Sequence, residues 1–250
     1  MAYHFGNFVW FELIVPDVGR ARRFYPETIG WRASVIETAG GPYTMLLEND
    51  DARAGIVTPP AGPQPPHWAP YLSVQDVDAA AARVTANGGQ VLAPAVDIPM
   101  IGRVAPVADP QGATMMLFKR ETAEDQTDAM HWTELWAHDA EGMLDFYKAV
   151  AEVTVETMPM GFGKYYVLRG SGDQPMGGVM TSPDPKVPPM WLSFVDVDDP
   201  DATLTRAQNN GGKIIKPAAD MPGIGRFGVF ADDQGAVLAV IRPAADQGEA

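Results

Sequence analysis

The chain has 250 residues, of which 46% are hydrophobic, so it can form one large domain or two ordinary domains with packed cores. Its formal net charge of −14 argues against binding to nucleic acids or anionic membranes, whose phosphates would repel it. The absence of cysteine excludes thiol chemistry, and no apolar run approaches the roughly 20 residues of a membrane helix, so a cytoplasmic protein is expected.

An apolar segment near the start of the chain, residues 8–17, occurs again at 130–139. Trp10 matches Trp132 and Glu12 matches Glu134, each 122 positions later (132 − 10). Each copy is typical of a strand that ends in an aspartate able to cap a following helix. Because alternate strand residues share a face, each copy places a tryptophan and a glutamate on one face. The repeat indicates an internal duplication.

The first half is predicted to contain two βαβββ units. The first unit has a strand at 8–14, a helix over 18–29 that ends at Gly30, and strands over 31–37, 43–47 and 54–58. A proline-rich connector at 59–66 leads to the second unit. That unit has a strand over 68–74, a helix over 76–87, and strands over 91–96, 103–108 and 113–118.

The second half repeats this order after a polar linker at 121–128. Its predicted elements are a helix over 139–150, strands near 153–157, 164–168 and 178–181, a strand over 191–195 and a helix that begins near Pro200. Each half carries an Asp-x-Gln-Gly hairpin turn, at 109–112 and at 232–235. The predicted domains are therefore 5–120 and 129–243, followed by a tail at 244–250.

Four βαβββ units in two halves, each with Asp-x-Gln-Gly-Ala before a last strand, resemble the vicinal oxygen chelate superfamily. This superfamily includes glyoxalase I, extradiol dioxygenases, fosfomycin-resistance enzymes and bleomycin-resistance proteins. The repeated Trp-x-Glu-Leu start and the repeated Gly-Arg strand are most similar to its two-module, hydroxylase-like bacterial branch. The resemblance implies an α+β fold of two half-open, β-barrel-like modules, each with a ligand cleft.

Metal-using members of that superfamily place ligands on the first strand of a half, the first strand of its second unit and the last strand. Counting from Asp17, Asp76 and Asp109 in the first half and from Asp139, Asp196 and Asp232 in the second gives Trp10, Ala69, Met116, Trp132, Pro189 and Ala239. None of these side chains is a usual metal ligand. The resemblance therefore implies that neither a metal nor another cofactor is bound at these positions.

Other potential metal ligands have simpler explanations in the sequence. The histidines, His4, His67, His131 and His138, are expected to be solvated or hydrogen-bonded, with metal ligation as the alternative. The acidic cluster of Asp76, Asp78, Asp196, Asp198 and Asp199 is expected to cap helices.

The strand faces that the resemblance implies would line two clefts. The first would contain Trp10, Glu12, Tyr71, Met116 and Phe118, and the second would contain Trp132, Glu134, Trp136 and Trp191. Tyr43 and Tyr165, also 122 positions apart, could orient a ligand, and each of these residues could instead be ordinary core. Aromatic and methionine walls suit a flat apolar molecule.

Glu12 and Glu134 need an explanation, because a carboxylate on an apolar strand face costs free energy unless it is paired or solvated. Arg103 and Arg226, at equivalent positions of the two halves, are candidate partners and candidate ligand-binding residues. The alternative is a glutamate that binds ligand or acts as a general base, since an apolar environment raises a carboxyl pKa.

Three functions remain open from the sequence. The first is a metal-independent protein, monomeric or homodimeric, that binds an apolar or aromatic small molecule, with a cationic ligand as one option. The second is a metal-dependent enzyme of the glyoxalase or dioxygenase type. The third is a metal-free lyase, isomerase or hydroxylase-like enzyme in which Glu12 or Glu134 transfers a proton.

Overall fold

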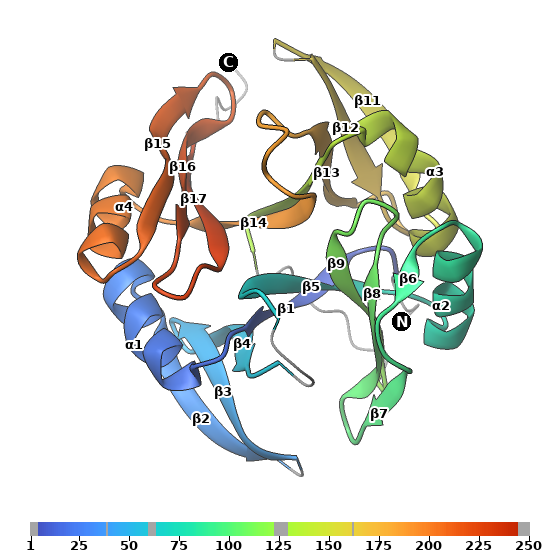
Figure 1. Ribbon diagram of the computed structural model, residues 1–250, viewed down its shortest axis with the longest axis horizontal. Coiled ribbons are helices and arrows are strands. Elements are labelled where there is room, and N and C mark those ends of the chain that lie inside the picture. Colours follow the sequence, from blue (N-terminus) through green and yellow to red (C-terminus); the bar gives the residue numbers. More distant parts are fainter. Residues whose placement is uncertain (1–4, 39, 60–63, 123–129, 162, 245–250) are drawn as a thin grey trace. The chain divides into compact units, whose positions relative to one another are not determined.

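The computed structural model describes residues 5–38, 40–59, 64–122, 130–161 and 163–244 (Figure 1). Within these residues, each half of the chain forms two units in which one strand and one helix precede further strands. The predicted α+β fold of four βαβββ units is confirmed. No helix of the described part of the chain is long and apolar enough to cross a membrane.

The first half forms one mixed sheet. Its first unit comprises β1 (Phe8–Ile14), α1 (Val18–Ile29), β2 (Arg32–Thr38), β3 (Gly41–Glu48) and β4 (Asp51–Val57). Its second unit comprises β5 (His67–Ser73), α2 (Val77–Ala86), β6 (Gln90–Val91), β7 (Val96–Ile98), β8 (Gly102–Ala108) and β9 (Thr114–Arg120). The strand order is β2-β3-β4-β1-β5-β9-β8-β6, and β7 pairs with β8.

The second half repeats this topology. The third βαβββ unit of the chain comprises β10 (Trp132–Ala137), α3 (Ala140–Ala151), β11 (Thr154–Met160), β12 (Gly163–Arg169) and β13 (Pro175–Thr181). The fourth comprises β14 (Met190–Asp196), α4 (Pro200–Asn209), β15 (Lys213–Met221), β16 (Gly225–Ala231) and β17 (Val237–Pro243). The strand order is β11-β12-β13-β10-β14-β17-β16-β15. The two βαβββ units of each half therefore share one sheet.

One predicted strand differs between the halves. The strand expected over 91–96 is interrupted, and two short strands, β6 and β7, replace it. Its counterpart β15 is continuous, but its pairing with β16 shifts register near Pro217. Pro94 and Pro217 are equivalent positions, and a proline cannot donate to the strand ladder. The proline accounts for the irregularity in both copies.

Aspartates cap all four helices of the described residues. The side chains of Asp17, Asp76, Asp139 and Asp199 each accept a hydrogen bond from the backbone N–H three residues later. The prediction that Asp196 caps the fourth helix is wrong, because that helix begins at Pro200 and is capped by Asp199, three residues later. The Asp196 carboxylate lies 3.0 Å from His131 Nδ1 instead.

The described residues form two compact units that cut across the halves. The first compact unit contains the described residues of 5–11, 69–122 and 132–192, and in it α2 packs on α3 (Figure 1). The second compact unit contains the described residues of 12–68, 130–131 and 193–244, and in it α1 packs on α4 (Figure 1). Most of the linker predicted at 121–128 and of the tail at 244–250 lies outside the described residues.

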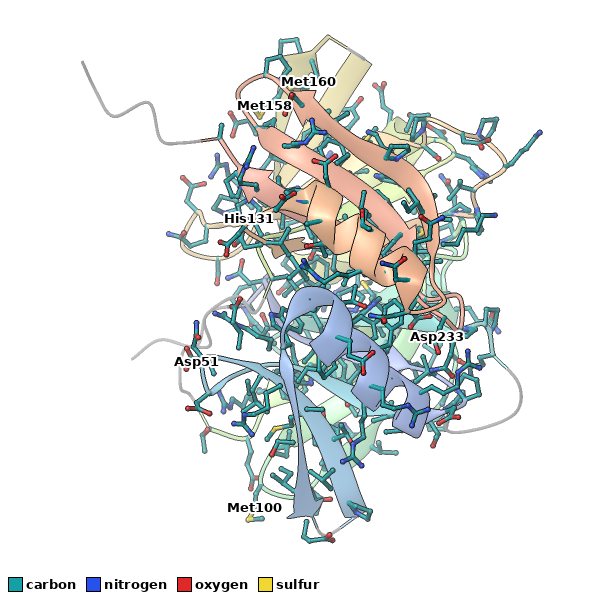
Figure 2. The ribbon with its side chains drawn as sticks, turned by 90° about the vertical axis from the view of Figure 1, so that its left-hand side faces the viewer. Asp51, Met100, His131, Met158, Met160 and Asp233 are labelled. Carbon is teal, nitrogen blue, oxygen red and sulfur yellow. The ribbon has the colours of Figure 1, made fainter. Side chains whose placement is uncertain are left out.

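Within each compact unit, an Asp-x-Gln-Gly turn of one half of the chain bonds to the start of a helix of the other half. In the second unit, Gln234 Oε1 accepts from the backbone N–H of Asp17 at 3.0 Å, and Gln234 Nε2 donates to the Asp17 carbonyl at 2.9 Å. Arg20 adds an ion pair of 2.8 Å to Asp233, which is labelled in Figure 2. The hairpin prediction is confirmed, since Asp232 N donates to the Ala236 carbonyl and closes the turn.

Candidate functional site

The first candidate is the Glu134 site, which we define as Glu134 with Trp132, Trp136, Tyr165 and Gly178, all in the first compact unit. Glu134 is only 8% exposed on β10. Its Oε2 accepts a hydrogen bond of 2.9 Å from the Tyr165 hydroxyl, and its Oε1 accepts one of 2.7 Å from Trp136 Nε1. A donor at each oxygen offsets the cost of burying the carboxylate.

Tyr165 is a fixed donor in this site. Trp132 Nε1 donates to the Tyr165 hydroxyl oxygen at 2.7 Å, so a continuous chain of donors runs from Trp132 through Tyr165 to Glu134. Burial, followed by the charge of Glu134, raises the pKa of Tyr165 far above its ordinary value. The hydroxyl therefore keeps its proton at neutral pH and cannot act as a base there.

Gly178 makes this arrangement possible. It lies opposite Glu134 in the parallel pairing of β10 with β13. A Cβ atom at this position would collide with the Tyr165 hydroxyl oxygen and with the ring carbon that bears it. Because Gly178 has no side chain, the Tyr165 ring can occupy the space beside the Glu134 carboxylate.

The second candidate is the Glu12 site, which we define as Glu12 with Tyr43 and Gly55, all in the second compact unit. The Tyr43 hydroxyl donates to Glu12 Oε1 at 3.0 Å. Gly55 lies opposite Glu12 in the pairing of β1 with β4, and a Cβ there would collide with the Tyr43 hydroxyl. Glu12 is partly exposed, whereas Glu134 is buried. Both copies of the duplication therefore hold a glutamate beside a tyrosine and a glycine.

The sequence did not identify Gly55 and Gly178 as site residues. Their spacing of 123 positions (178 − 55) matches the duplication and could have marked them. Glycine inside a strand is a known sign of a close approach by another group.

The apolar side chains expected in the first cleft gather in the first compact unit. Tyr71 and Phe118 pack edge to face with ring centroids 5.7 Å apart. We call this group the aromatic cluster; its members are Tyr71, Val104 and Phe118, with partly buried Val9, Trp10 and Met116.

The predicted pairing of the glutamates with arginines is wrong. Arg103 forms a bidentate pair with Asp78, with both bonds 2.9 Å, and a further bond of 3.0 Å to Asp97. Arg226 makes the equivalent bidentate pair with Asp201. Each arginine thus joins its strand to an aspartate in the first turn of the adjacent helix, where a negative charge is favoured.

Trp191 was predicted to line the second cleft, and this prediction is also wrong. Its Nε1 donates to the Tyr147 hydroxyl at 3.2 Å, and its ring packs edge-on against Tyr147 on α3. Counting from the true helix cap, Asp199, makes Leu192 rather than Pro189 the counterpart of Ala69 (199 − 7). Because the count had started from Asp196, three residues too early, it assigned the wrong face of β14 to the cleft.

The positions that hold metal in the superfamily do not fit a metal here. In the first half, Trp10 and Met116 are part of the aromatic cluster, and Ala69 is buried. In the second half, Leu192 and Ala239 are fully buried and Trp132 donates to Tyr165. No group of three or more histidine, aspartate or glutamate side chains in the described part of the chain could hold an ion.

The histidines have other partners. His67 Nδ1 lies 2.8 Å from the Pro65 carbonyl, and His138 Nε2 lies 3.1 Å from the Val187 carbonyl. His131, labelled in Figure 2, lies with its Nδ1 3.0 Å from an Asp196 carboxylate oxygen, and His4 lies outside the described residues. These contacts agree with hydrogen-bonded histidines rather than with metal ligands.

Comparisons with known proteins match nearly the whole chain. A relative in Mycobacterium tuberculosis (strain CDC 1551 / Oshkosh), "Putative glyoxylase CFP32", is 37% identical over 255 residues and is covered to 98%, as is this chain. "Anthracycline biosynthesis protein DnrV" of Streptomyces peucetius is 32% identical over 260 residues, which cover 93% of this chain and 91% of that protein.

Solved structures share the fold at low sequence identity. The Mn(II)-bound glyoxalase from Novosphingobium aromaticivorans gives a TM-score of 0.61 at 17% identity, covering 96% of this chain and 82% of that one. The 2,3-dioxygenase LapB from Pseudomonas sp. KL28 gives 0.60 at 11% identity, covering 100% and 97%. The model of the Glyoxalase/Bleomycin resistance protein/Dioxygenase superfamily matches residues 7–117 and 129–240, and the chain belongs to this superfamily.

Proposed function

We propose that this chain is a metal-independent protein that binds a flat, apolar or aromatic small molecule carrying a donor or cationic group. The observation that carries this proposal is the duplicated glutamate, which keeps a tyrosine donor beside it on an otherwise apolar strand. An ionised carboxylate only accepts hydrogen bonds, so it selects donors or cations on a ligand. The net charge of −14 attracts cations toward the surface as well.

The aromatic cluster supports a flat ligand. Tyr71, Phe118 and Trp10 offer ring faces and edges, and Met116 adds an adaptable thioether. Binding sites for small molecules are mostly apolar walls with a few polar groups that fix orientation. The relative named for anthracycline biosynthesis is consistent with an aromatic ligand.

The residues at the metal positions support independence from metal. Tryptophan, alanine, methionine and leucine offer no oxygen or imidazole ligand. Filling these positions with apolar side chains also suits an apolar ligand.

A second candidate function is a metal-free enzyme in which a glutamate transfers a proton. The partial exposure of Glu12 favours it, because a carboxylate that a substrate can reach can accept a proton from that substrate. The relative named as a glyoxylase is consistent with an enzyme. A glutamine substitution at Glu12 or Glu134 would then abolish turnover, whereas a pure binder has no turnover to lose.

Binding is tested by titrating the protein with an anthracycline and, separately, with the same compound lacking its amino sugar. We expect saturable quenching of tryptophan fluorescence and a raised melting temperature with both, and tighter binding of the amino-sugar compound. Decanoate, which has an apolar but non-aromatic chain and an anionic head group, is the control. Failure of both aromatic probes to bind, or binding that needs an added divalent metal, would contradict the proposal.

A further inference from the structure

The apolar face that carries the aromatic cluster continues along the hairpin of β7 and β8 (Figure 1). Val96 lies directly opposite Val104, a member of the cluster, in the antiparallel pairing of these strands. Directly opposite residues point to the same face, so Val96 extends that face, and Ile98 extends it two residues further on. Val96 is 54% exposed and Ile98 is 39% exposed. The sheet face beside the aromatic cluster is therefore open to solvent.

Arg120 lies on this same face. It follows Phe118 of the aromatic cluster by two residues on β9, and strand residues two apart share a face. The pairing of β8 with β9 is regular, with Gly102 opposite Arg120, so no slip of register changes that face. A rise of about 3.4 Å per residue places the Cα atoms of Phe118 and Arg120 about 7 Å apart. The guanidinium is therefore within reach of a molecule whose ring contacts Phe118.

No structural ion pair accounts for Arg120. Within the part of the chain that the structure describes, its guanidinium has no acidic partner, although the residue is partly buried. By contrast, Arg103 and Arg226, at equivalent positions of the two halves, each form a bidentate pair with an aspartate. The counterpart of Arg120 in the second half is Pro243, 123 positions later (243 − 120), and each lies opposite a glycine. The duplication thus repeats the structural arginine but not Arg120.

We propose that Arg120 binds the acid group of an aromatic ligand whose ring lies on the aromatic cluster. A guanidinium presents a planar pair of donors that matches a carboxylate and binds it with two charge-assisted hydrogen bonds. The ligand class is therefore an aryl acid with a short chain between ring and acid. This inference rests on the proposed function, because it takes the aromatic cluster as the surface that binds the ring. It adds an acid group to the donor or cationic group of that ligand.

Titration calorimetry of the full-length protein tests this with two matched probes, 2-naphthylacetate and 2-naphthylacetamide. The probes share the ring and nearly the same shape, and only the acetate carries a charge. We expect the acetate to bind at least tenfold more tightly, although the net charge of −14 disfavours anions. Equal binding of the two probes, or tighter binding of the amide, would overturn the proposal.

Substitutions on β9 separate direct contact from long-range attraction. Arg120→Gln should remove the preference for the acetate and leave the affinity for the amide within twofold. Lys119→Gln is the matched control, because it removes the same charge from the neighbouring residue, which is exposed on the opposite face of β9. It should change the preference by less than twofold. An equal loss in both variants, or an unchanged preference in Arg120→Gln, would overturn the proposal.

If Arg120→Gln does not fold, Arg120→Lys provides the second variant. It keeps the charge but loses the planar fork, so it should retain only part of the preference for the acetate. A preference as large as that of the wild type would overturn the assignment of a bidentate contact.

Chemical protection in the wild type locates the acid group. 2,3-Butanedione in borate modifies arginine side chains, and peptide mass spectrometry follows each of them. Saturating 2-naphthylacetate should slow the modification of Arg120 at least fivefold and leave Arg22, exposed on α1, unchanged. If both naphthyl probes bind equally and Arg120 is not protected, the ring site stands and the role of Arg120 fails. If neither probe binds, the proposed function fails, and this inference fails with it.

Discussion

The hydroxyl of Tyr147 donates a hydrogen bond of 2.8 Å to Asp109 Oδ2 and so joins a helix of the second half to the last hairpin of the first half. Tyr147 is fully buried, and its hydroxyl oxygen also accepts from Trp191 Nε1 at 3.2 Å. Trp68, Tyr25 and Asp232 form the equivalent chain in the other compact unit. The duplication thus preserved a buried polar network in each unit.

Replacing Tyr147 by phenylalanine should lower the free energy of unfolding by about 1–3 kcal/mol, because Asp109 loses a buried donor and Trp191 loses its acceptor. Urea denaturation followed by circular dichroism measures this. Tyr166→Phe is the control, since within the described part of the chain its hydroxyl bonds to the exposed ion pair of Glu141 with Lys164 and to no buried polar group. An equal loss of unfolding free energy in both variants would show that the buried network contributes no more to stability than the surface contact.

The stability contributed by Asp109 should fall as the pH rises. Burial raises its pKa, although the hydrogen bonds from Tyr147 and the backbone act in the opposite direction. Because the folded-state pKa exceeds the unfolded one, this contribution is fully present below about pH 4 and is lost as the pH passes through the raised value. Compared with Asp109→Asn by urea denaturation, the wild type should lose relative stability from about pH 4 to pH 7; a relative gain would contradict the shift.

Asp201 should show the opposite dependence. Its bidentate bond from Arg226 lowers the pKa of Asp201, so the stabilisation is present above the unfolded pKa near 4 and is lost as the pH falls through the lowered value. Asp201→Asn should therefore be less stable than the wild type at pH 7, and the difference should disappear in strong acid. Thermal unfolding across pH values measures this, and a difference that persists in strong acid would argue against the charge pairing.

Gly178→Ala should destabilise the protein by about 1–3 kcal/mol, because the added methyl group displaces the Tyr165 ring from Glu134. Gly161→Ala is the matched control; nothing lies within 4 Å of its added Cβ, so its effect should stay within about 0.5 kcal/mol. In the Tyr165→Ala background, Gly178→Ala should cost much less, since the colliding ring is gone. Additive losses in the double variant would rule out this collision as the cause.

Divalent metals should leave the stability of the purified protein unchanged. Trp10, Met116 and Ala69 offer no oxygen or imidazole ligand to these ions, and an added metal raises the melting temperature only if it binds the folded state. Thermal unfolding with excess Mn²⁺, Zn²⁺ or Fe²⁺, and again with a chelator, measures this. A melting temperature that rises with one metal and falls on chelation would identify a site that these residues do not predict.

The sequence by itself determined the four βαβββ units, the aspartate caps Asp17, Asp76 and Asp139 and the pairing of Glu12 with Glu134 across the duplication. These features depend on local periodicity, on backbone groups near in sequence and on repetition, all of which can be read from a linear string. The error at Asp196 shows the limit, because a shift of three residues in a helix start reverses the face on which Trp191 lies.

Only the tertiary structure decided which partner each charged side chain takes. Tyr43 and Tyr165, not Arg103 and Arg226, contact the glutamates, and Gly55 and Gly178 provide the space for those rings. Such partners come from neighbouring strands whose register is set by pairing across the sheet, and one residue of slip exchanges its two faces. A hydrogen bond needs atoms within about 3 Å, and spacing along the chain does not fix distances on that scale.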